Sequence, residues 1–203
     1  PATATGRIPE AMAMYRARGP NTHPDSELSK RFRADLSPDT PTSREDADWR
    51  EAGGMEARDP LKIAFLGVWD TVGALGLPGF LGALPRLVNQ HYAFHDTELS
   101  RSVAAARHAV AIDERRRHFP PALWSNLERL NRGKDGPTGC YSQLWFPGNH
   151  GIVGGSGRVP ELSAFPTAWI ADGAEAQGLA FRPERLDAIT GLADAGVDDK
   201  GAP

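Results

Sequence analysis

The stretch KIAFLGVWDTVGALG, residues 62–76, decides the fold. Its apolar run, residues 63–68, is short and rich in β-forming side chains, and Gly73 and Gly76 follow it. Short apolar runs closed by turns are typical of strands that are buried on both faces of a parallel sheet. The stretch therefore predicts an α/β protein in which this strand lies inside the sheet and helices cover both faces.

Asp70 comes directly after this predicted strand. In open α/β sheets, ligands and reactive groups gather just outside the carboxyl ends of the strands. A carboxylate at this place is a candidate for site chemistry. An aspartate that caps a helix or stabilises a turn explains the residue equally well, so the local sequence leaves both interpretations open.

The composition excludes several classes of protein. The chain of 203 residues has a formal net charge of -3, so no basic excess points to nucleic acid. Its single cysteine, Cys140, excludes an internal disulfide framework. No apolar run approaches the ~20 residues that span a bilayer, and residues 1–10 lack a signal-peptide core. We expect a protein that is not transmembrane, is cytoplasmic in the producing cell, and leaves it, if exported, without a signal peptide.

Three regions follow from local composition. Residues 1–60 contain proline-rich loop sequence and two predicted helices, 8–18 and 28–36, so we expect a polar lead-in. Residues 61–180 hold the predicted core. The small and polar residues of 181–203 predict a frayed tail.

The segment after Asp70, residues 75–87, is apolar but broken by glycine and proline. It is expected either to line an apolar pocket beside the acid or to be a loop that packs on the core. In the first case Phe80, Leu81 and Leu84 are the candidate substrate contacts.

Two histidines with helical spacing, His91 and His95, resemble half of a zinc site. A zinc-protease motif needs glutamate after the first histidine, and Tyr92 stands there. We therefore predict structural histidines and expect neither a metal nor another cofactor.

A long helix is predicted over residues 99–118. Leu99, Val103, Ala106 and Val110 recur at helical spacing, and two prolines follow the segment. The charges at its end, residues 113–117, are expected to be solvated or paired with one another.

A second strand is predicted over residues 141–147, followed by His150 between glycines. A lone histidine is more often structural. Here, an acid after one strand and a histidine after the next match the Asp…His half of the order Ser…Asp/Glu…His in α/β-hydrolases. We expect Asp70 and His150 at the same sheet edge, near hydrogen-bond distance. A last helix is predicted over 164–177, with Ser163 as its N-cap.

Three blocks of sequence resemble a single family. They are FLGVWDTVGALG (65–76), AFHDTELSRSVAAARHAVAIDERRRHFPPALW (93–124), and QLWFPGNHGIVGGS with ELSAFPTAWIADGAEAQGL (143–156 and 161–179). They occur in the order found in a family of α/β-hydrolases known from type VI secretion phospholipase effectors (Tle-type) and from uncharacterised bacterial and fungal proteins. IPEAMAMYRAR (8–18) resembles the helix after that family's nucleophile segment. The resemblance implies the C-terminal part of an α/β-hydrolase fold, with the catalytic acid at Asp70 and the catalytic histidine at His150.

Two departures from the family pattern stand out. Family members usually have an aspartate two residues after the histidine, where this chain has Ile152. The nucleophile elbow G-x-S-x-G is absent, and the nearest string, GGSGR at 154–158, lacks the final glycine. The resemblance implies that the elbow, the oxyanion donors and the first strands precede residue 1. We therefore expect this chain to be inactive by itself.

The resemblance implies a Ser-Asp-His lipase or phospholipase that cleaves carboxylic esters, in the setting of a secreted antibacterial effector. The implied partners are a lipid or ester substrate, whose acyl chain residues 75–87 would line, the missing N-terminal segment, and a secretion adaptor or immunity protein. The alternative is a truncated or decayed hydrolase module that only binds a partner.

Overall fold

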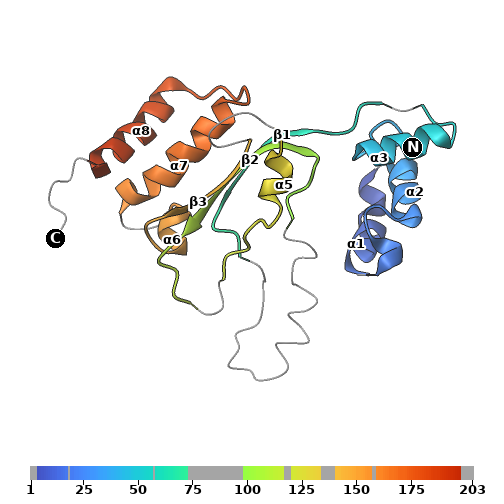
Figure 1. Ribbon diagram of the computed structural model, residues 1–203, viewed down its shortest axis with the longest axis horizontal. Helices are drawn as coiled ribbons and strands as arrows, with labels where there is room; N and C mark the ends of the chain where they lie inside the picture. Colours follow the sequence, from blue (N-terminus) through green and yellow to red (C-terminus); the bar gives the residue numbers. More distant parts are fainter. Residues whose placement is uncertain are drawn as a thin grey trace, which may run out of the picture. The chain divides into compact units, whose positions relative to one another are not determined.

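The computed structural model describes residues 4–17, 19–56, 58–72, 98–116, 120–133, 140–156 and 159–197. The chain divides into two compact units, Pro1–Lys62 and Ile63–Pro203. Figure 1 draws the first unit in blue to cyan and the second in cyan to red. The described part of the first unit is helical, and that of the second has α/β structure.

The first unit contains the 3-10 helices η1 Ala4–Arg7 and η2 Pro20–Thr22 and the helices α1 Ile8–Arg16, α2 Glu27–Leu36 and α3 Arg44–Ala52. α1 and α2 confirm the two helices predicted in this region. α3 escapes prediction because its sequence, REDADWREA, has few apolar side chains. It buries Asp46 and Arg50 instead, and Ser43 caps it by accepting the Asp46 N–H at 3.1 Å.

A parallel sheet of three strands forms the centre of the second unit. The strands β1 Ile63–Trp69, β2 Val103–Ala111 and β3 Tyr141–Phe146 lie in the order β1-β2-β3. Leu66 pairs with Ala106, which pairs with Tyr141 on its other side. The predicted α/β character is confirmed, and both predicted strands are present.

The expected burial of β1 is wrong among the described residues. β1 is an edge strand, and Ile63 and Trp69 are 43% and 39% exposed. The strand between two neighbours is β2, in which Ala106, Ala109 and Val110 are all 0% exposed. The fully buried parallel strand therefore exists, but it lies forty residues further along the chain than the sequence pattern suggested.

β2 also overturns the helix predicted over residues 99–118. Because β2 is covered on both faces, its sequence VAAARHAVA does not alternate between apolar and polar residues. A run without alternation cannot be distinguished from a helix by periodicity alone. Pro121 does not end a helix either, since it forms an isolated antiparallel bridge with Val72.

Helices cover the two faces of the sheet unequally (Figure 1). α7 Pro160–Glu175 packs on β1 and β2, α6 His150–Val153 packs on β2 and α7, and α8 Pro183–Val197 packs on α7. α5 Leu127–Asn131 covers the other face with Trp124.

Two predictions about the last helices need correction. α7 begins at Pro160, so Ser163 is not its N-cap, and the Ser163 hydroxyl donates to the Ile152 carbonyl at 2.8 Å. The frayed tail expected from residue 181 is a helix, α8, over Pro183–Val197. α8 packs on α7, and its side chains Ile189 and Leu192 line a hollow between the two helices.

Gly67 sets how closely α7 approaches β1. A Cβ atom at Gly67 would lie 2.5 Å from Ile170 Cγ2. Gly67→Ala should therefore reduce the free energy of unfolding by about 1–3 kcal/mol, measured by denaturant titration. The matched control is Gly191→Ala in α8, where a Cβ atom meets nothing within 4 Å, and this variant should gain about 0.5–1 kcal/mol. Equal effects of the two variants would contradict the close packing.

Candidate active site

Asp70 lies where β1 ends, at the carboxyl edge of the parallel sheet. Its side chain is 1% exposed, and its φ of 41° is unusual for a residue other than glycine. The backbone N–H of Asp70 donates to the Ala109 carbonyl at 2.7 Å, and its Oδ1 accepts the Ala111 N–H at 2.8 Å. β2 therefore fixes both the backbone and one carboxylate oxygen of Asp70.

His150 meets the other oxygen of this carboxylate. Its Nδ1 lies 2.7 Å from Asp70 Oδ2, and its side chain is 35% exposed. His150 is the first residue of α6, which Asn149 caps by accepting the Ile152 N–H at 3.1 Å. The predicted contact between Asp70 and His150 at one sheet edge is confirmed. A buried carboxylate that receives the Nδ1–H holds the imidazole in a single tautomer and orientation.

Two acids that directly follow β2 hold the backbone around His150. The Asp113 carboxylate accepts the Gly148 N–H at 2.8 Å, and the Asp113 N–H donates to the Gly148 carbonyl at 3.1 Å. The Glu114 carboxylate accepts the His150 N–H at 3.3 Å. Hydrogen bonds from Arg116 are the largest cause that lowers the pKa of Glu114 to about 2, so it stays ionised.

The expectation that the charges of residues 113–117 are solvated or paired with one another is confirmed in part, because Glu114 and Arg116 form an ion pair. The contacts of Asp113 and Glu114 with the backbone of Gly148 and His150 go beyond that expectation. The Glu114 side chain is 5% exposed and Arg116 is paired with it at 2.8 Å. The sequence does contain the signal, because an acid pair at the end of a parallel strand lies at the same edge as Asp70. The helical spacing of the apolar residues in 99–118 conceals this signal, because it predicts a helix instead of a strand.

Ile152, the residue at the family's aspartate position, packs against Gly148. A Cβ atom at Gly148 would lie 2.6 Å from Ile152 Cγ2, and Gly148 has a φ of 109°. The histidine loop is therefore held by the Asn149 cap, by Asp113 and Glu114, and by an apolar contact at Ile152.

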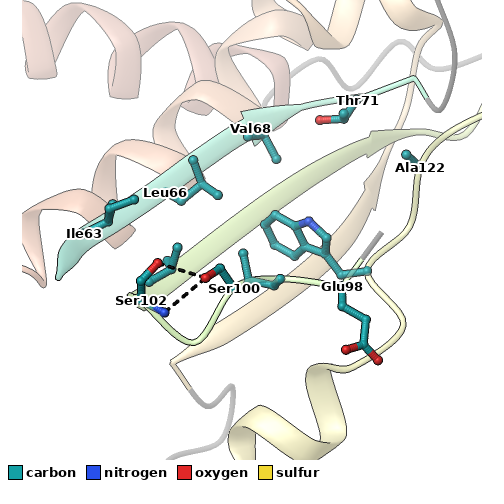
Figure 2. A pocket seen from close by; sticks show the side chains of 11 residues that line it. Ile63, Leu66, Val68, Thr71, Glu98, Ser100, Ser102 and Ala122 are labelled. Carbon is teal, nitrogen blue, oxygen red and sulfur yellow. Dashed lines mark hydrogen bonds between the residues drawn. The ribbon is translucent and has the colours of Figure 1, made fainter. Parts of the chain in front are cut away.

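An apolar groove of about 370 Å³ runs along the face of β1 that carries Leu66 and Val68 (Figure 2). It is lined by residues of β1, β2 and the segments before and after them: Ile63, Leu66, Val68, Thr71, Glu98, Leu99, Ser100, Ser102, Val103, Ala122 and Trp124. Its polar lining residues include Thr71, which directly follows Asp70, and Ser100 and Ser102, whose hydroxyl oxygens lie 2.9 Å apart. Neither Asp70 nor His150 lines the groove.

Comparison with known protein families gives this geometry a context. A family model described as "T6SS, Phospholipase effector Tle1-like, catalytic domain" matches residues 1–173. This chain belongs to that family. The resemblance to type VI secretion phospholipase effectors is thereby confirmed. No individual curated protein and no solved structure gives a significant match to the chain.

The Tle1-like catalytic match includes all the residues of the Asp70–His150 site. The candidate substrate contacts Phe80, Leu81 and Leu84 lie outside the described residues, as do His91 and His95. Over the ranges that the structure does describe, no three histidine, cysteine or acidic residues are grouped so that they could bind a metal. Within the same ranges, no helix has the length and apolar character needed to cross a membrane.

Proposed function

We propose that Asp70 and His150 are the acid and the base of a Ser-Asp-His triad in an α/β-hydrolase catalytic domain that cleaves lipid esters. The contact between His150 Nδ1 and Asp70 Oδ2 at 2.7 Å carries this proposal. Its place at the carboxyl edge of a parallel sheet, in a chain of the Tle1-like phospholipase family, supports it.

In the proposed mechanism His150 Nε2 takes the proton from the serine hydroxyl as the oxygen attacks the ester carbonyl. The C–O bond to the alcohol then breaks, and Nε2 returns the proton to the leaving alcohol. A water molecule repeats both steps and releases the fatty acid. Asp70 keeps the imidazole in the Nδ1–H tautomer and stabilises the cation that forms in each step.

We propose that the serine comes from sequence outside these 203 residues, which contain no G-x-S-x-G. Ser156 has the wrong motif, and its hydroxyl donates to the Gly151 carbonyl at 3.1 Å. On this proposal, the chain is the C-terminal part of the catalytic domain.

The substrate that we propose is a phospholipid or another ester with a long apolar part. The family supports this class, and an apolar groove that begins one residue after Asp70 agrees with it. Residues 75–87 remain the segment proposed to line the acyl chain. For a secreted effector, we further propose synthesis in the cytoplasm of the producing cell and an adaptor or immunity protein as partner.

The experiment compares residues 1–203 with a protein extended by the upstream coding sequence. Both are assayed on p-nitrophenyl esters and phospholipid vesicles and are treated with a fluorophosphonate that labels activated serines. We expect turnover and labelling by the extended protein alone, because a base without a positioned nucleophile and oxyanion donors gives little catalysis.

Ser156→Ala in the extended protein is the matched control and should leave turnover unchanged. Turnover by residues 1–203 that is lost in His150→Ala would contradict the proposal, since the nucleophile would then lie inside the chain. Turnover by neither protein would favour the non-catalytic module.

A further inference from the structure

A second histidine, His108, lies beside the turn at Asp70. The proposed mechanism gives it no step. His108 is on β2, is 0% exposed, and packs against Trp124 with the ring centres 5.1 Å apart and the ring planes tilted by 49°. Its Nε2 lies 3.2 Å from the Thr71 backbone nitrogen, and its Nδ1 lies 3.0 Å from Gln143 Oε1. His108 therefore links the residue after Asp70 to β3.

Two backbone groups determine where the protons are in this network. A backbone N–H can only donate, so the Thr71 N–H requires that His108 Nε2 accepts. The Trp124 N–H likewise donates to Gln143 Oε1 at 2.9 Å, which identifies that atom as the amide oxygen. Nδ1 must then carry the proton and donate to Gln143. The network is complete only when His108 is neutral and protonated on Nδ1.

The bond to Thr71 holds the peptide that leaves Asp70. The left-handed φ of 41° at Asp70 is strained for an L residue and persists only where the surroundings fix it. On the incoming side, the Asp70 N–H is bound to Ala109. On the outgoing side, the Thr71 N–H is bound to His108, and the Thr71 carbonyl accepts the Ala122 N–H at 2.7 Å.

We infer that His108 is a positioning residue for the proposed reaction: in its neutral Nδ1–H form it holds the turn that aims the Asp70 carboxylate at His150. This inference rests on the proposed function of that pair. His108 acts through the backbone of Thr71 and touches no reacting atom.

The same geometry gives the inference a pH dependence. Protonation would place an Nε2–H against the Thr71 N–H and break the bond. Among the groups packed on His108, Asp70, which follows β1, has a titratable side chain, whereas Gln143 from β3 and Trp124 do not. Burial lowers the pKa of His108, and this effect exceeds the opposite effects of Gln143 and Asp70. The Thr71 bond is therefore intact at neutral pH and is lost as the pH falls below the lowered pKa.

Three substitutions in the active, extended protein test the inference. His108→Leu removes the acceptor, whereas His108→Gln places an amide oxygen near the position of Nε2 that accepts at every pH. Tyr141→Phe is the matched control, because it removes another buried bond of the same sheet, from the Tyr141 hydroxyl to the Val103 carbonyl at 2.7 Å. We expect His108→Leu to lower kcat about 10–100-fold with KM nearly unchanged.

We expect His108→Gln to recover most of the wild-type kcat. In this variant, the part of the fall in kcat at low pH that comes from protonation of His108 should be absent. Tyr141→Phe should lower the melting temperature without lowering kcat. A kcat loss in His108→Leu no larger than in Tyr141→Phe would overturn the inference. So would nitrogen-15 spectra of the wild type at pH 7.5 that show His108 protonated on Nε2.

The outcomes separate this inference from the proposed function. If Asp70→Asn and His150→Ala keep full activity, the proposed triad is wrong. If these two variants are inactive and His108→Leu behaves like Tyr141→Phe, the triad stands and the role of His108 is wrong.

Discussion

His150→Ala in the active, extended protein is expected to lower kcat on phospholipid vesicles by a factor on the order of 10⁶. The reason is that a serine hydroxyl is a weak nucleophile without a base at hydrogen-bond distance. Asp70→Asn should lower kcat by about 10⁴-fold, because an amide at 2.7 Å from Nδ1 no longer selects the Nδ1–H tautomer.

The control for histidine removal is His23→Ala. His23 lies in the first unit with its side chain 63% exposed, and its loss should leave kcat unchanged. Because Asp70 and His150 act as one unit, the double variant should be no slower than His150→Ala alone. Full activity of His150→Ala, or multiplied losses in the double variant, would contradict the triad.

Arg50→Leu is expected to give the largest loss of stability in the first unit, about 3–5 kcal/mol. Arg50 and Asp46 are both fully buried and are joined by bonds of 3.2 and 3.3 Å. Removing the guanidinium leaves a buried carboxylate without its main counter-charge and frees the Ser37 and Pro38 carbonyls, which Arg50 binds at 2.8 and 2.9 Å.

Hydrogen exchange of the α2 and α3 amides measures this loss within the first unit. The control is Arg44→Ala on the same helix. Its pair with Asp48 at 2.9 Å is exposed on both sides, so its loss should change stability by about 0–1 kcal/mol. Asp46→Leu combined with Arg50→Leu should recover part of the loss. A change below about 1 kcal/mol for Arg50→Leu would show that the buried pair is not important for this unit.

The ionisation of Asp46 adds a pH test to the same pair. Burial acts to raise the pKa of Asp46, but hydrogen bonds from Arg50 and Thr42 and the charge of Arg33 outweigh it, so the pKa is lowered. A carboxyl whose pKa is lower in the folded state contributes stability above its unfolded pKa, and this is lost as the pH falls.

Local patterns predicted the parts of the site that lie at strand ends. The apolar run of β1, the aspartate after it and the histidine after β3 were enough to place Asp70 and His150 together. The long helix α7 was also predicted, although its first residue is Pro160 rather than Ala164.

The features that the sequence pattern did not predict, β2 and α3, depend on their contacts with the rest of the fold. β2 is alanine-rich because both of its faces are covered, and this removes the alternation by which a strand is usually identified. A helix over residues 99–118 would not bring Asp113, Glu114 and His108 to the sheet edge, so the sequence pattern does not predict their contacts. α3 was missed because its buried residues are charged, and only their mutual pairing makes that burial tolerable.

The left-handed backbone of Asp70 also bears on how this lineage changes over generations. Strain at a residue other than glycine persists under selection where function needs the side chain at that place. If the proposed function is right, a lineage that had lost ester hydrolysis would be free to drift, and glycine at position 70 would relieve the strain. Descendants that keep aspartate there are therefore expected to keep catalysis, whereas those with glycine there are expected to have become binding modules.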